Sequence, residues 1–117
     1  MSDIKEKDLK DHVKSNGTCK MLADFFFILS NPTRIALFCS LSEGAKSVSQ
    51  LAEDVEKTIQ NVSQHLRLMR EKDLVCTAKQ GQQIFYSIAD VRFIEGCRLI
   101  RDASIDQVHK HVNSLDS

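Results

Sequence analysis

The most constraining feature of the chain is a short amphipathic segment that runs from Gln60 to Arg70. Its apolar residues Val62, Leu66 and Met69 recur at helical spacing, so one face of the predicted helix is expected to pack against the rest of the domain. The remaining positions carry amides, a hydroxyl, an imidazole and two guanidinium groups. These groups suit hydrogen bonding to base edges and charge pairing with phosphates, although an ordinary solvated helix shows the same pattern.

A second short helix is predicted directly before this segment. Ser47 and Gln50 fit a capping box at its start, and the helix extends to about Val55. Glu56-Lys57 then forms a tight turn, and Thr58 is placed to cap the following helix. Two short helices joined by so brief a turn predict a helix-turn-helix over about residues 47–71.

The flanking segments predict two further helices and a hairpin. A strongly apolar helix begins near Thr18, and Asn31-Pro32 then provides an N-cap and a first helical position for the next helix, which Ile35, Phe38 and Leu41 are expected to bury. Alternating residues on either side of Gln80-Gly81-Gln82 predict a two-stranded hairpin over about residues 74–88. A final helix is expected over about residues 91–112, with a long apolar stripe.

The 117 residues therefore predict a polar N-terminal arm over residues 1–17 and a single domain over residues 18–117. The fold class is mainly α, a winged helix-turn-helix with a two-stranded β-hairpin wing and an additional helix at each end. The sequence shows no signal-peptide pattern, and its longest apolar run is too short to span a bilayer, so we expect a cytoplasmic protein that does not contact membranes. The four cysteines should then be thiols.

Four segments of the chain carry a family resemblance: Leu29-Ser-Asn-Pro-Thr-Arg-Ile-Ala-Leu37, Val62-Ser-Gln-His-Leu66, Leu74-Val75 and Ile84-Phe-Tyr-Ser-Ile-Ala-Asp90. In order and spacing they resemble the arsenic-repressor (ArsR/SmtB) family of bacterial transcriptional repressors. The resemblance implies a homodimer built on the first and last long helices, a recognition helix in each major groove of double-stranded operator DNA, a wing near the minor groove, and a small inducer that releases the DNA.

The resemblance also implies which residues contact DNA. Thr58 would lie beside the phosphate backbone, where a helix N-terminus favours an anion. Arg67 and Lys79 would supply positive charge, and Gln82 is a further candidate on the wing. The residues expected to face bases or nearby phosphates are Gln60, Asn61, Ser63, Gln64 and His65.

Two features depart from the family pattern. Asp73 stands where many relatives have Gly before the Leu-Val pair. The wing carries glutamines where relatives often have arginines and an acid. Because the net charge of the chain is zero and this wing is weakly basic, we expect a shallower salt dependence of DNA binding than a basic wing would give.

The family's metal sites are not matched. One zinc site in the family uses an Asp-x-His pair at the start of the last helix, but here Asp90-Val91-Arg92 has a guanidinium in the ligand position, and guanidinium does not ligate zinc. His109 and His111 provide no matching pair and are expected to be solvated. A thiolate site near the helix-turn-helix is missing as well, since residues 45–75 contain no cysteine. We predict no bound metal and no cofactor.

The cysteines leave three interpretations open. Cys39 matches one redox cysteine in a branch of the family that senses sulfane sulfur or oxidants, and Cys97 lies on the last helix about two turns before the position of that branch's second cysteine. A cross-link between Cys39 and Cys97 would tie the DNA-reading core to the dimer helices. Alternatively, arsenite or a soft metal recruits Cys19 as well, or the thiols only pack as small apolar groups. Cys76 is expected to be structural.

Other function classes are less well supported. A winged helix that binds protein and has no operator of its own is an alternative, because the net charge is zero and the wing is weakly basic. An enzyme is not predicted, since the sequence has no glycine-rich phosphate loop, no His-Glu-x-x-His helix and no nucleophile elbow.

Overall fold

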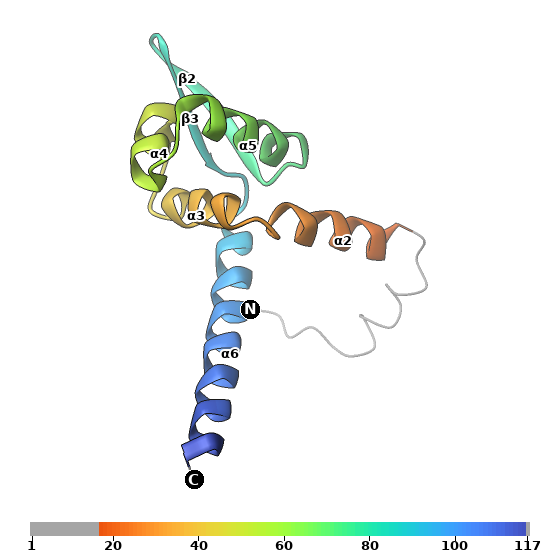
Figure 1. Cartoon of the computed structure of the whole chain (residues 1–117). Helices are drawn as coiled ribbons and strands as arrows, with labels where there is room; N and C mark the ends of the chain where they lie inside the picture. Colours follow the sequence, from red (N-terminus) through yellow and green to blue (C-terminus); the bar gives the residue numbers. More distant parts are fainter. Residues whose placement is uncertain (1–16, 117) are drawn as a thin grey trace.

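The computed structural model describes residues 17–116, so nearly all of the predicted N-terminal arm lies outside the described residues. Figure 1 shows α3, α4 and α5 grouped beside a small sheet, while α2 and α6 extend away from this body. The fold is a mainly helical winged helix-turn-helix, as predicted. In chain order the elements are α2 (Thr18–Ile28), α3 (Pro32–Leu41), β1 (Lys46–Ser47), α4 (Val48–Val55), α5 (Ile59–Glu71), β2 (Val75–Gln80), β3 (Gln83–Ile88) and α6 (Val91–Asp116).

Side-chain caps start three of the helices where the sequence predicts them. Asn31 Oδ1 accepts hydrogen bonds from the Thr33 and Arg34 amides at 2.9 and 3.1 Å at the start of α3. Ser47 and Gln50 form the reciprocal capping box of α4. Thr58 Oγ1 accepts a hydrogen bond from the Asn61 amide at 3.1 Å at the start of α5. These bonds satisfy amides that the helices leave unpaired, and so fix where the helices begin.

The core lies where α3, α4 and α5 meet the sheet. Val62, Leu66 and Met69 are all fully buried, as the spacing on α5 predicts. They pack with apolar residues from the neighbouring elements, among them Leu37 and Leu51. Because this buried stripe fixes the rotation of α5, the polar residues of the helix are directed outward.

The structure corrects the predicted sheet and the predicted face of α3. The sheet has three strands in the order β1-β3-β2, because Lys46 and Ser47 pair antiparallel with Tyr86 and Phe85. Ile35, expected in the core, is 45% exposed, whereas its neighbour Arg34 is only 8% exposed. Arg34 takes the inward position because its guanidinium bonds to backbone carbonyls at the end of α2.

Two turns contain non-glycine residues in the left-handed region. Glu56, at the C-cap of α4, has φ of 57°, and Asp73, just after α5, has φ of 60°. Glycine adopts this conformation with less strain than any residue that has a Cβ. Asp73 therefore stands at a position whose backbone conformation would suit glycine better.

α2 and α6 form the outer part of the molecule. α2 is bent 91° from α3 at the intervening break, and Phe25 of α2 stacks on Phe93 of α6 with ring centroids 5.2 Å apart. α6 extends to Asp116, beyond the predicted end at 112. In the described part of the chain no single helix is long and apolar enough to cross a membrane, and α2 and α3 meet that criterion only as a bent pair, by length and composition.

Candidate nucleic-acid interface

The outward face of α5 brings together most of the residues that the sequence singled out. The apolar stripe on the same helix is buried in the core and anchors the helix, so these polar side chains lie on its outward surface. Thr58, at the helix N-terminus, is exposed as well. The predicted contact residues that are exposed on α5 are Gln60, Asn61, Ser63, Gln64 and Arg67. The face combines amide and hydroxyl groups with one guanidinium, which suits hydrogen bonding to base edges beside a phosphate backbone.

Arg67 pairs with Glu71 one turn later on the same helix, with Arg67 Nε 3.5 Å from Glu71 Oε1. Both side chains are largely exposed, and such surface pairs contribute little to stability. The guanidinium of Arg67 therefore remains accessible to an external anion.

His65 is set apart from these neighbours because it is half-buried and its Nδ1 lies 3.3 Å from Arg34 Nη1. Burial lowers the pKa of His65 below its ordinary value of 6.5, and the positive charges of Arg34 and Lys57 lower it further. The ring is therefore neutral at pH 7, and its Nδ1 side faces the protein body.

Arg34 is a residue of this site that sequence reasoning did not single out. Its Nε donates to the carbonyl of Ile28, and its Nη2 donates to the carbonyl of Phe27 at 3.3 Å. Its guanidinium carbon also lies 5.9 Å from the centre of the Phe27 ring. The one available signal was a charged residue within an otherwise apolar helical segment.

The wing projects from the sheet as the hairpin β2–β3, visible in Figure 1 beyond α4 and α5. Its pairing runs from Val75–Ile88 to Gln80–Gln83, and Gly81 adopts a φ of 62° in the turn. Lys79 and Gln82, the two predicted wing contacts, are both exposed near this tip. The structure therefore places them on a protruding ribbon that is separate from α5.

A polar cluster ties α3, β1 and α4 together. Lys46 Nζ donates to Asp54 Oδ2 at 2.7 Å, to Glu43 Oε1 at 2.6 Å and to Ser40 Oγ at 2.9 Å. The hydrogen bond from Lys46 lowers the pKa of Asp54, and the bond from Ser40 adds to this effect. Lys46 thereby compensates the acidic charge of Asp54 and Glu43 on this side of the helix-turn-helix.

Two of the three candidate sensing cysteines line the same cavity. Cys39 of α3 and Cys97 of α6 both line an open cavity of about 490 Å³ between α2, α3 and α6. Burial raises the pKa of Cys97, and the nearby Cys39 raises it further. Cys19, on α2, does not line this cavity. Cys76 is exposed on β2, with its Sγ 3.3 Å from Ser87 Oγ, so it does not pack in the core.

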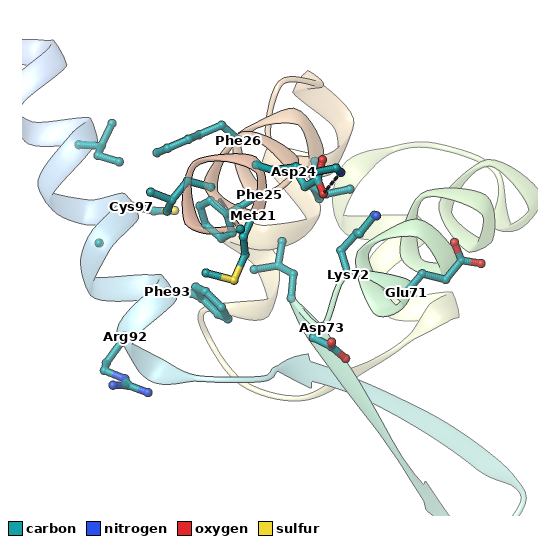
Figure 2. Close-up of a pocket in the computed structure, with 17 residues that line it drawn as sticks. Met21, Asp24, Phe25, Phe26, Glu71, Lys72, Asp73, Arg92, Phe93 and Cys97 are labelled. Atoms are coloured by element: carbon teal, nitrogen blue, oxygen red, sulfur yellow. Dashed lines mark hydrogen bonds and ion pairs between the residues drawn. The ribbon is translucent and has the colours of Figure 1, made fainter. Parts of the chain in front are cut away.

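A larger cavity of about 770 Å³ lies between α2, the end of α5 and the start of α6. Figure 2 shows Met21 and Phe25 of α2 close to Phe93 of α6 in the lining of this cavity, with Cys97 nearby. Cys97 therefore borders both cavities.

Asp90 and Arg92 form an ion pair with each other at the start of α6. Arg92 donates to both carboxylate oxygens of Asp90, with Nη2 to Oδ2 at 2.7 Å and Nε to Oδ1 at 3.1 Å, and this lowers the pKa of Asp90 to about 2. Among residues 17–116 no group of three or more His, Cys, Asp or Glu side chains is arranged to hold a metal ion.

Comparison with known proteins agrees with this architecture. The family described as "Bacterial regulatory protein, arsR family" matches residues 31–77. The chain is 38% identical over 78 residues to the HTH-type transcriptional regulator KmtR of Mycobacterium tuberculosis, covering 67% of this chain but only 59% of KmtR. It is 28% identical over 96 residues to the transcriptional repressor SmtB homolog of Synechocystis, covering 82% of this chain and 73% of that protein.

Comparison with solved structures gives a match that covers almost the full length of a relative. The crystal structure of M. tuberculosis Rv0081 superposes with a TM-score of 0.77 at 30% identity, covering 84% of this chain and 99% of that one. The predicted resemblance is thereby confirmed: the chain belongs to the arsR family of bacterial regulatory proteins.

Proposed function

We propose that the protein is a homodimeric transcriptional repressor of the cytoplasm that binds double-stranded operator DNA and is released from it by an inducer. The observation that carries this proposal is the exposed polar face of α5, which is held outward by a fully buried apolar stripe. A helix presented in this way by a preceding short helix is the arrangement that reads a major groove.

Within this proposal the recognition residues have distinct roles. Gln64 and Asn61 hydrogen-bond to base edges, Thr58 lies beside a phosphate at the helix N-terminus, and Arg67 pairs with phosphate. Gln60, Ser63 and His65 complete the contact surface of α5. Lys79 and Gln82 contact the backbone or minor groove from the wing.

The exposed apolar surface of α2 and α6 supports a homodimer. Phe27 is 63% exposed and Val108 is 61% exposed, as are many of their apolar neighbours on the two helices. Large contiguous apolar surfaces on small proteins mark interaction sites. A second copy of the chain packed against them would bury these surfaces.

Salt-dependent DNA binding tests the proposal. Fluorescence anisotropy of the reduced protein on labelled duplex from upstream of its own gene is expected to show tight binding that weakens as salt rises. With Arg67 and Lys79 of each protomer on phosphates, the slope of log affinity against log salt should be about −3.6.

The control is an unrelated duplex of equal length, which should bind more weakly at each salt concentration. Absence of duplex binding even at low salt would contradict the proposal and favour the alternative of a winged helix that docks on protein.

For the inducer, the shared cavity of Cys39 and Cys97 favours reactive sulfur or an oxidant over arsenite or a soft metal. The thiolate of Cys39 attacks the sulfane sulfur of an organic persulfide, which releases a thiolate and leaves a persulfide on Cys39. The thiolate of Cys97 then attacks the inner sulfur of that group, which forms a disulfide and expels hydrosulfide. Cys39, as the more exposed thiol, reacts first, since burial raises the pKa of Cys97 and lowers its thiolate fraction.

An organic persulfide is therefore expected to weaken operator binding of the native protein by at least about tenfold. Cys39→Ser should abolish this response, while Cys76→Ser, a matched change of an exposed cysteine on β2, should retain it. Release of DNA from Cys39→Ser by the persulfide would contradict the dithiol mechanism. Release by arsenite that requires Cys19 would instead support the soft-metal alternative.

A further inference from the structure

Arg34 occupies the corner between α2 and α3 and reaches two other elements from there. It is 8% exposed, although it carries a permanent positive charge. Two of its nitrogens donate to the last carbonyls of α2, at Ile28 and Phe27, where the negative end of the helix dipole stabilises a cation. A third nitrogen, Nη1, points to His65 on α5.

The chemistry of this contact fixes the proton of His65. A guanidinium has only donors, so the Nδ1 that faces Arg34 Nη1 at 3.3 Å is the acceptor. A neutral imidazole whose Nδ1 accepts carries its proton on Nε2. Among residues 17–116 the only hydrogen-bond partner of the His65 ring is Arg34, which leaves Nε2–H available to an external group.

We propose that Arg34 is a positioning residue that holds His65 as the Nε2–H tautomer, so that the recognition helix presents a hydrogen-bond donor to DNA at this position. This inference rests on the proposed function. A neutral donor suits an acceptor such as a phosphate oxygen or the N7 or O6 of guanine. His65 then contributes a directional hydrogen bond to DNA without adding a positive charge.

The same contacts connect the dimer helices to DNA reading. α2 carries part of the exposed apolar surface, and its last carbonyls hold Arg34. A change in the angle between α2 and α3 would displace the guanidinium and remove the constraint on His65. Arg34 is thus placed to transmit the quaternary arrangement to α5 through one hydrogen bond.

Acid is expected to weaken operator binding, which is an unusual pH dependence for a histidine that faces DNA. The charged groups that act on His65 are Arg34 of α3 and Lys57 of the turn before α5. Acid adds a second proton at Nδ1, directly opposite the guanidinium, so protonation disrupts the arrangement that binds DNA. One pH unit below the His65 pKa, operator affinity should fall about tenfold per half-site.

A histidine that contacted DNA without this tether would behave in the opposite way. Its positive charge would attract phosphate, and affinity would rise in acid. His65→Gln retains a donor but does not titrate, so its operator binding should show a flat pH profile even though His12, His109 and His111 remain. Arg34→Met should convert the acid-induced loss of affinity into a gain.

Long-range ¹⁵N–¹H NMR of His65 in the DNA-free protein at pH 7 gives an independent readout, and it remains decisive if Arg34→Met does not fold. A proton on Nε2 together with acid-weakened binding would support the inference. A proton on Nδ1, or wild-type binding that strengthens in acid, would overturn it. Failure to bind duplex at every pH would refute the proposed function, while the NMR measurement would still decide whether Arg34 fixes the tautomer.

Discussion

Replacing Val108 with aspartate is expected to convert the protein from a dimer to a monomer and to lower operator affinity by at least about 100-fold. Val108 belongs to an exposed apolar row on α6 whose members are spaced three and four residues apart, as in the seam of a coiled coil. The row consists of Ile105, Val108, Val112 and Leu115. In a symmetric dimer each substitution occurs twice, and burying one valine contributes about 1.5–3 kcal/mol.

The aspartate also places a charge in the apolar contact, so the loss should exceed the area term alone. Sedimentation velocity measures the change in mass, and anisotropy on the operator duplex measures the change in affinity. Lys110→Gln is the matched control, because it makes the same change in net charge on the opposite side of α6. A Val108→Asp protein that sediments as a dimer would contradict the proposed interface.

Replacing Gln64 with alanine is expected to weaken specific operator binding by at least about 30-fold, since a side chain that reads a base edge contributes about 1–3 kcal/mol and the dimer presents it twice. Gln64 is exposed on α5, and alanine favours helix, so the fold and its stability should be unaffected. The salt slope should also be unchanged, because Gln64 carries no charge.

Anisotropy on operator and unrelated duplexes over a series of salt concentrations separates these effects. Arg67→Gln provides the contrast, since removing a charge that neutralises a phosphate should weaken both duplexes and reduce the salt slope by about 1 for each phosphate left without its cation. Gln107→Ala is the matched control, because it makes the same substitution on α6, away from α5. Equal loss of affinity on both duplexes for Gln64→Ala would show that this residue does not read sequence.

The helix-turn-helix could be predicted from sequence because its signals are local. The Ser47–Gln50 capping box and the Thr58 cap each depend on residues within three positions, and the Val62–Leu66–Met69 stripe needs only helical spacing. For the same reason the polar face of α5 followed directly from its sequence. The sequence could not assign the roles of its members, because those roles depend on what each side chain meets.

The features that the sequence did not predict depend on contacts between distant segments. β1 has only two residues, too few to show alternation, and exists because Lys46 and Ser47 pair with β3 about 40 positions later. Arg34 displaces Ile35 from the core because carbonyls at the end of α2 and His65 on α5 satisfy its donors. The predicted end of α6 at residue 112 was short, since the helix continues to Asp116.

The left-handed residues Glu56 and Asp73 have a consequence for how this protein could diverge in evolution. They flank α5 at either end, so the helix lies between two sharp changes of chain direction. One inserted residue would rotate every later side chain of α5 by about 100° and move the buried stripe out of register. Substitutions at exposed positions such as Gln60 and Gln64 leave that stripe intact. Under the proposed function, operator preference and folding stability are therefore separable, and new specificities can arise by substitution at constant helix length.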